Sequence, residues 1–104
     1  MKNVYEIYNE NIKEIENAFK EQNVDFIDFE DKGYDNCPIV VTDLSGYIEE
    51  ASATQIRINE KHNELEIAVQ LESGGDEIWF LISEIPYMSA VETLDTAADI
   101  LGIA

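Results

Sequence analysis

The sequence predicts an α+β domain in which an antiparallel sheet of four or five strands packs against helices near both ends of the chain. Two patterns predict it. Apolar residues recur at helical spacing in the first and last twenty residues, and between them apolar and polar residues alternate as they do in strands. A length of 104 residues is typical of one domain, so we expect residues 1–104 to form a single unit.

Residues 3–21 are expected to form an amphipathic helix. Asn3 stands three residues before Glu6, a pairing typical of a capped helix N-terminus. The apolar positions recur every three or four residues, as on one face of a helix. They are Val4, Ile7, Tyr8, Ile12, Ile15 and Phe19.

Two short strands are predicted next. Residues 24–29 are rich in aromatic and β-branched side chains, and residues 32–36 have turn composition. Residues 38–42 form the second strand, whose first residue is Pro38, a position at which a missing N–H is tolerated. Residues 43–50 are expected to be a loop.

Residues 53–83 predict a three-stranded antiparallel meander with turns at about 59–63 and 73–76. The prediction depends on a strict period of two, because a slip of one residue would move every apolar side chain to the other face. The side chains expected on the face covered by helices are Leu65, Ile67, Val69, Ile78, Phe80 and Ile82.

The last helix is expected to begin at Ser89, because Ser89 and Glu92 have the spacing of a capping box. Gly102 is well placed to end it. Its predicted apolar stripe consists of Val91, Leu94, Ala98 and Leu101.

The net charge of −17 is extreme for a chain of this size. Residues 1–50 hold 13 acidic and 4 basic residues, and residues 51–104 hold 10 and 2, so the halves carry −9 and −8. The acidity therefore belongs to the whole folded body, whose self-repulsion opposes compaction. Such a surface repels nucleic acid and anionic membranes, and it favours a positively charged partner.

The composition indicates an intracellular protein. Cys37 is the sole cysteine, which excludes an intramolecular disulfide and a secreted disulfide scaffold. No signal-peptide pattern is present, and the longest apolar run, residues 78–82, is far too short to span a bilayer. We expect a cytoplasmic protein, and the sequence leaves its oligomeric state open.

The sequence predicts no catalytic residue, no metal and no cofactor. His62, the sole histidine, falls in a predicted hairpin tip, where its side chain is solvated, and Cys37 is expected to be a small buried residue. One Cys and one His cannot supply the four ligands of a structural zinc site. Asp28, Glu30 and Gly33 match the start of a calcium loop, but the required later ligands are absent.

Acidic residues form stripes along both predicted helices, and like charges at this spacing destabilise a helix. We predict these stripes as the partner-binding surface. The residues are Glu6, Glu10, Glu14 and Glu21 on the first helix, and Glu92, Asp95 and Asp99 on the last. A third stripe, Glu64, Glu66 and Glu72, is expected on the solvated face of the meander, so Glu66→Lys would be nearly neutral.

Trp79 and Leu81 are expected on the sheet face opposite the main core. Two alternatives follow for them. A helix or the segment 43–50 covers them, or Trp79 is an aromatic anchor in a protein interface, where Trp is enriched.

Together these patterns favour a small acidic interaction protein. We expect an inhibitor or modulator that binds the basic, nucleic-acid-binding surface of a partner protein, as anti-restriction, anti-CRISPR and nuclease-immunity proteins do. The basis is an analogy of charge and size. The alternatives are a small-ligand or divalent-metal-binding protein, or a small enzyme, with clustered carboxylates, and an acidity that serves solubility alone.

Overall fold

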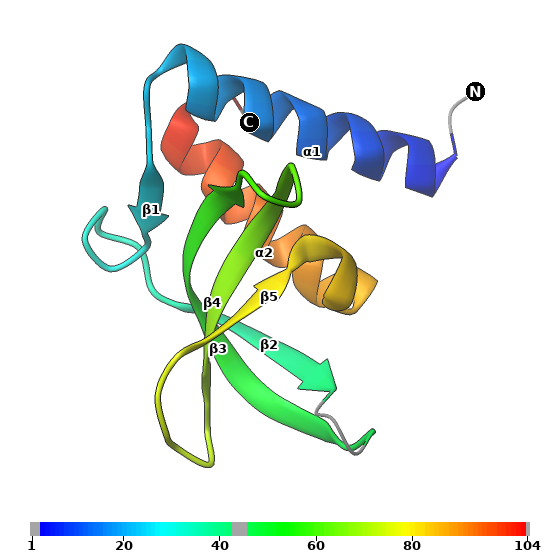
Figure 1. Ribbon diagram of the computed structural model, residues 1–104, viewed down its shortest axis with the longest axis vertical. Helices are drawn as coiled ribbons and strands as arrows, with labels where there is room; N and C mark the ends of the chain where they lie inside the picture. Colours follow the sequence, from blue (N-terminus) through cyan, green and yellow to red (C-terminus); the bar gives the residue numbers. More distant parts are fainter. Residues whose placement is uncertain (1–2, 43–45, 104) are drawn as a thin grey trace.

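The computed structural model describes residues 3–42 and 46–103, which form an α+β fold with two α-helices and five strands (Figure 1). The predicted fold class is confirmed. The elements are α1 (Val4–Glu21), β1 (Phe26–Asp28), β2 (Cys37–Thr42), β3 (Ile48–Asn59), β4 (Glu64–Leu71), β5 (Ile78–Leu81), a short 3₁₀ turn (Ile82–Glu84) and α2 (Tyr87–Leu101).

The antiparallel sheet is organised around β3, its longest strand. Strand β4 pairs with one edge of β3, and β5 pairs with β4, which is the predicted meander. Its last strand is shorter than predicted, because Ile82 begins the 3₁₀ turn, and Ile78, expected on the covered face, is 43% exposed. The other edge of β3 is shared: β2 pairs with its first half, and β1 pairs with its second half, where Ile27 lies opposite Ile56. Three of the other four strands therefore pair with β3 directly, and β3 is the centre of the sheet.

A β-bulge in β3 keeps the core side chains on one face. Ala53 pairs with Val69 and Gln55 with Ala68, so Thr54 is the extra residue, and its hydroxyl donates to the Ala68 carbonyl at 3.4 Å. Without the bulge, the residues on either side of it would point to opposite faces.

Strand β3 begins earlier than the sequence predicted. Ile48 pairs with Thr42, so residues 48–50 are strand rather than the expected loop. Residues 43–45 of that loop lie outside the described residues. Strand β1 is shorter than predicted, because only residues 26–28 pair with β3.

Both helices contribute to one core against a single face of the sheet. Helix α2 lies across that face, and α1 runs beside α2 near the end of the sheet that carries the turn between β3 and β4 (Figure 1). The centre of the core is made by fully buried side chains from both helices and from the sheet. They include Ile15, Phe19, Ile27, Phe29, Ile56, Leu65, Ile67, Val69, Ala90, Leu94 and Ala97.

The two helices run in the same direction. Near their N-termini, the Tyr87 ring lies 5.8 Å from the Tyr5 ring and 5.1 Å from the Tyr8 ring, centroid to centroid. Near their C-termini, Gln22 Nε2 donates to the Leu101 carbonyl at 2.9 Å. These contacts at both ends fix α1 and α2 side by side.

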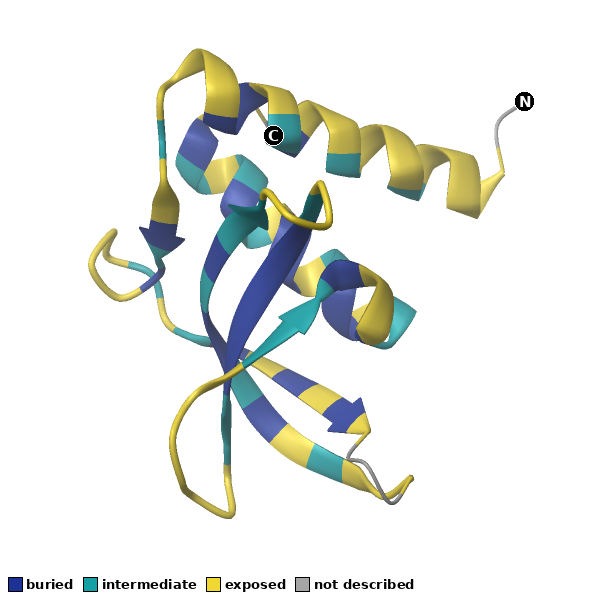
Figure 2. Cartoon of the chain, viewed as in Figure 1, coloured by how far each residue is buried: buried dark blue, intermediate teal, exposed yellow. Residues whose placement is uncertain are grey.

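The apolar face of α1 is buried only in its second half. Ile15 and Phe19 are fully covered, but Val4 and Ile7 are 57% and 47% exposed, although the sequence placed them on the same stripe. Figure 2 shows the first turns of α1 largely exposed. A groove lies between Val4 and Ile7 and the facing side of α2, so α2 does not cover these two side chains.

Helix α2 begins at Tyr87, directly after Pro86, and the predicted capping role of Ser89 is wrong. The buried Ser89 hydroxyl instead accepts from the Val40 amide at 3.1 Å and donates to the Val40 carbonyl at 3.2 Å. It thereby gives hydrogen-bond partners to the Val40 amide and carbonyl on the outer edge of β2, where unpaired backbone groups would invite pairing with another chain. Gly102, in the left-handed conformation at φ +76°, ends the helix as predicted.

Candidate functional site

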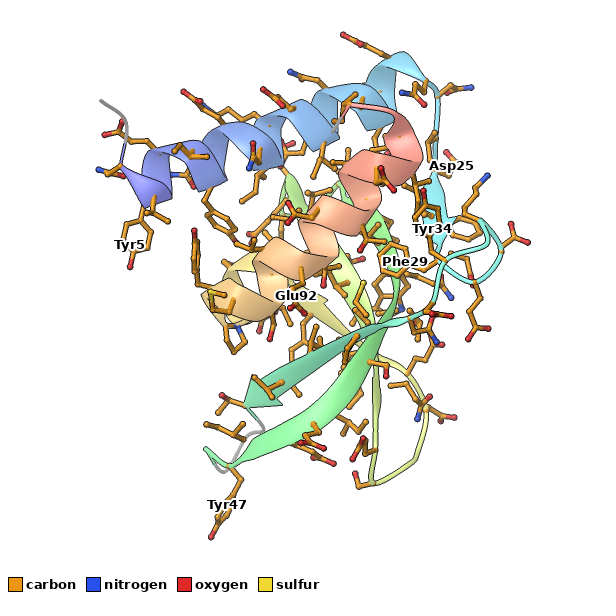
Figure 3. All side chains as sticks on the ribbon, turned by 180° about the vertical axis from the view of Figure 1, so that it is seen from behind. Tyr5, Asp25, Phe29, Tyr34, Tyr47 and Glu92 are labelled. Atoms are coloured by element: carbon orange, nitrogen blue, oxygen red, sulfur yellow. The ribbon has the colours of Figure 1, made fainter. Side chains whose placement is uncertain are left out.

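The exposed side of α2 is acidic. Within α2, all of whose residues the structure describes, the exposed side chains are Met88, Glu92, Asp95 and Asp99. Three of these four are carboxylates, and the helix contains no basic residue. Figure 3 looks onto this side of α2, which faces away from the sheet.

Two carboxylates of α1 border the same region. Glu14 and Asp95 line one cavity of about 290 Å³ between the helices, and Glu14 and Glu21 line a second, of about 270 Å³, between α1 and Ile103, which follows α2. The packing of α1 beside α2 therefore brings together acids that are far apart in sequence. We call Glu14, Glu21, Glu92, Asp95 and Asp99 the carboxylate face.

Glu6 and Glu10 lie further from α2 than the sequence pattern suggested. Four residues advance about 40° beyond a full helical turn, so Glu6 is rotated by about 80° from Glu14. The Glu6 carboxylate also accepts from Asn3 Nδ2 at 3.2 Å, and the Asn3 side chain accepts from the Glu6 amide, which confirms the predicted cap. Neither Glu6 nor Glu10 lines the cavities that Glu14 and Glu21 line.

The lysines of α1 lie on the side away from α2. By the same rotation, Lys13 and Lys20 are about 100° and 120° from Glu14, beyond Glu6. They act instead on Glu16, whose pKa is raised by burial and by the nearby Glu64, an effect that Lys20 and Lys13 offset only in part. Of the described residues that line these two cavities and a further one of about 180 Å³ between the N-terminal halves of α1 and α2, none is Lys, Arg or His.

A further hollow adjoins the other side of α2. This cavity of about 420 Å³ lies between the start of α2 and strands β2 and β3, and Glu50, Glu72 and Glu92 contribute to its lining together with Val40 and Met88. Among the residues that the structure describes, no three His, Cys, Asp or Glu side chains are arranged to hold a metal ion. The acids surround this hollow without converging.

Asp99 also has a structural role. Its carboxylate accepts a hydrogen bond from the Tyr34 hydroxyl at 2.7 Å, which ties the loop after β1 to the end of α2. This hydrogen bond raises the pKa of Tyr34, because it favours the protonated phenol. Asp99 is therefore less suitable than its neighbours for testing a binding role by mutation.

Trp79 lies on the sheet face opposite the helices, as predicted. Its cover is Arg57, whose guanidinium carbon stands 3.7 Å from the centroid of the Trp79 ring. Arg57 reaches there from β3 across β4, and Ala68 beneath them is fully buried. Trp79 is therefore half-buried by a cation–π contact within its own sheet.

Glu66 is buried, and its predicted place on a solvated stripe is wrong. It is 6% exposed, and Arg57 Nε donates to its Oε1 at 2.5 Å. Its second oxygen, Oε2, accepts from Asn59 Nδ2 at 2.9 Å. Arg57 and Glu66 are direct cross-strand partners, and the stacked Arg57 shields Glu66 from solvent.

The other residues considered for chemistry have local roles. His62 is exposed in the turn after β3, and Cys37 is buried with its Sγ 3.3 Å from Thr96 Oγ1, both as predicted. Burial raises the pKa of the Cys37 thiol, which keeps it protonated. In the calcium-like loop, Asp28 accepts from the Asp31 amide and Glu30 accepts from Asn36, so both acids bond within the loop.

No protein-family model, curated protein or solved structure matches the chain. Within residues 3–42 and 46–103, no helix has both the length and the apolar character that crossing a membrane requires.

The crowding of carboxylates predicts that salt stabilises the protein. Added salt shortens the screening length from about 10 Å at 0.1 M to about 3 Å at 1 M and so weakens repulsion among the acids. We expect a higher Tm in 0.5 M than in 20 mM NaCl at pH 7, measured by thermal unfolding. Near pH 4, where carboxylates are partly protonated, the salt effect should shrink. A flat or falling Tm at pH 7 would contradict the argument from self-repulsion.

Proposed function

We propose that the protein is a non-catalytic binding module whose carboxylate face occupies the basic surface of a partner protein, in the place where that partner would bind nucleic acid. The observation that supports this most strongly is the arrangement of acids on α1 and α2. Glu14 faces Asp95 across the groove between the helices, Glu21 lines the adjoining cavity beside Ile103, and no Lys, Arg or His lines either cavity among the described residues.

The spacing of these acids suits Lys and Arg partners. Glu92, Asp95 and Asp99 span seven residues, or about 10 Å along the helix axis. The three carboxylates are therefore about 5 Å apart along the axis. Their charge density is somewhat below that of one DNA strand, which carries a charge about every 3.4 Å. Carboxylates accept charge-assisted, often bidentate, hydrogen bonds from guanidinium groups, as phosphates do. Complementary charge also speeds the encounter of two proteins and suppresses wrong partners.

The test compares two variants in which the same number of acids is changed to Lys at two different places on the surface. Partners are captured from a host lysate, and the association rate of a captured basic protein is then measured. The triple variant Glu14→Lys, Glu92→Lys and Asp95→Lys should slow association at low salt by about tenfold or more. The control triple is Glu60→Lys, Asp76→Lys and Glu77→Lys, at exposed positions outside the carboxylate face, and it should change the rate less than about twofold.

A competition experiment completes the test. A DNA duplex should compete with the protein for the captured partner, because both would occupy one basic site. Equal effects of the two triple variants would mean that net charge alone matters, and the proposed face would be wrong. A partner that binds DNA and this protein at the same time would contradict the nucleic-acid-like mode.

A further inference from the structure

A continuous furrow runs along α1. Three cavities follow one another in it, two of them between α1 and α2 and the third between α1 and Ile103, and neighbouring cavities share lining residues. The first, of about 180 Å³, shares Asn11, Leu94 and Asp95 with the second, and the second shares Glu14 and Ile103 with the third. The furrow follows α1 from Val4 to Glu21, a length of about 26 Å at 1.5 Å per residue.

The furrow has apolar walls that the fold leaves uncovered. Val4 and Ile7 line its first cavity while more than 45% exposed, and the exposed Ile103 lines the other two. Single exposed apolar residues are common on protein surfaces. Here, however, Val4 and Ile7 belong to the apolar stripe of α1 and face the apolar side chains of Val91 and Leu94 across an open groove. Burial of this surface by another chain would be favourable.

We propose that the furrow binds an amphipathic helix of the partner protein, with an apolar row seated between α1 and α2 and with Lys or Arg on its flanks. This inference rests on the proposed function and names the element of the partner that is bound. A furrow of about 26 Å is as long as a helix of about 17 residues, and its stretch from Val4 to Glu14, about 15 Å, lies against α2. Binding of an amphipathic helix in an apolar groove is a common mode of recognition.

The charges of the furrow select this occupant. Glu14, Glu21 and Asp95 stand along it, and no basic residue lines it within the described chain. Flanking Lys or Arg side chains would pair with these acids. A second copy of this chain would bring its own acidic helices against them, and such like-charge contacts are strongly unfavourable.

The probe is an 18-residue synthetic peptide of Leu and Lys, with Leu at positions that form one helical face, compared with a scrambled peptide of the same composition. Asn11→Trp fills the furrow from an exposed position and changes no charge. Asn9→Trp is the matched control, because two residues advance about 200° and place Asn9 on the side of α1 away from α2. Affinities are measured by fluorescence anisotropy in 0.5 M NaCl, where non-specific attraction is screened.

We expect the helical peptide to bind in 0.5 M NaCl and the scrambled peptide to bind at least tenfold more weakly. Asn11→Trp should weaken the helical peptide at least tenfold, and Asn9→Trp less than twofold. Ile7→Gln, which removes an exposed apolar wall residue, should also weaken it and serves if Asn11→Trp does not fold. Circular dichroism verifies the fold of each variant.

The outcomes separate this inference from the proposed function. Equal affinities of the helical and scrambled peptides, or equal effects of the two Trp variants, would overturn the furrow as a helix site. If the Glu14, Glu92 and Asp95 reversal still slows association with the captured partner, the proposed function stands without it. If that reversal changes neither partner association nor the peptide affinity measured in 20 mM NaCl, where charges are little screened, the proposed function and the choice of a basic helix both fail.

Discussion

Ile67→Asp is expected to unfold the domain. Ile67 is 0% exposed in β4, where it lies between its cross-strand partners Ile56 and Phe80 on the face covered by the helices. An aspartate there would be a buried charge without a partner, and such a group costs several kcal/mol. A domain of this size has about 5–15 kcal/mol of stability, and self-repulsion works against this one.

The matched control is Ile48→Asp. Ile48 is also a strand isoleucine, at the start of β3, but it is 76% exposed. We expect this variant to remain folded with a change of about 0.5 kcal/mol or less. Far-ultraviolet circular dichroism and urea unfolding measure both. A well-folded Ile67→Asp protein with the Tm of Ile48→Asp would mean that the register of β4 is wrong.

The second large effect is expected at Glu66. Glu66→Lys should lower the free energy of unfolding by about 3 kcal/mol, because it places a second cation against Arg57 in a buried position. The figure is at the low end for buried ion pairs, since the Arg57 side chain is 44% exposed and water can solvate it. Loss of the hydrogen bond from Asn59 adds to the cost.

Two further variants isolate the contribution of the Arg57–Glu66 ion pair to stability. Glu72→Lys makes the same charge change at an exposed position just after β4 and should alter stability by about 0.5 kcal/mol or less. Adding Arg57→Glu to Glu66→Lys should recover part of the loss, as a double-mutant cycle can measure. If Glu66→Lys is as stable as Glu72→Lys, Glu66 is solvated in solution and the described contact is not maintained.

The local elements were predictable because their causes are local. The cap of Asn3 on Glu6, the spacing of Ile15 and Phe19, and the left-handed Gly102 all act within a few residues of the chain. The same holds for the alternation in β4, which places Leu65, Ile67 and Val69 on one face whatever their partners are.

At Ser89, a contact with a distant strand overrides the local sequence signal for a helix cap. Its spacing to Glu92 is that of a capping box, but Val40 at the edge of β2 has an amide and a carbonyl that both need a hydrogen-bond partner. Buried backbone groups must be satisfied, so the hydroxyl is used there and α2 starts two residues earlier. Nothing in the sequence shows that α2 and β2 meet.

Glu66 and Trp79 show the same limit for side chains. Their positions on the outer face of the sheet follow from the period of two. That Arg57 bonds one and stacks on the other depends on the pairing register, which includes the bulge at Thr54. Register is a property of two strands together, so neither strand alone predicts it.

The sequence by itself determined the fold class, the helix of residues 4–21, the meander, and the presence of acidic stripes on both helices, because each depends on periodicity and charge along one segment. Only the tertiary structure decided which acids share a surface. The packing of α1 beside α2 brings Glu14 and Glu21 to the furrow with Asp95 and turns Glu6 and Lys13 away. The physical reason is that the rotation of a helix about its axis is set by what it packs against, and that contact lies about 80 residues away along the chain.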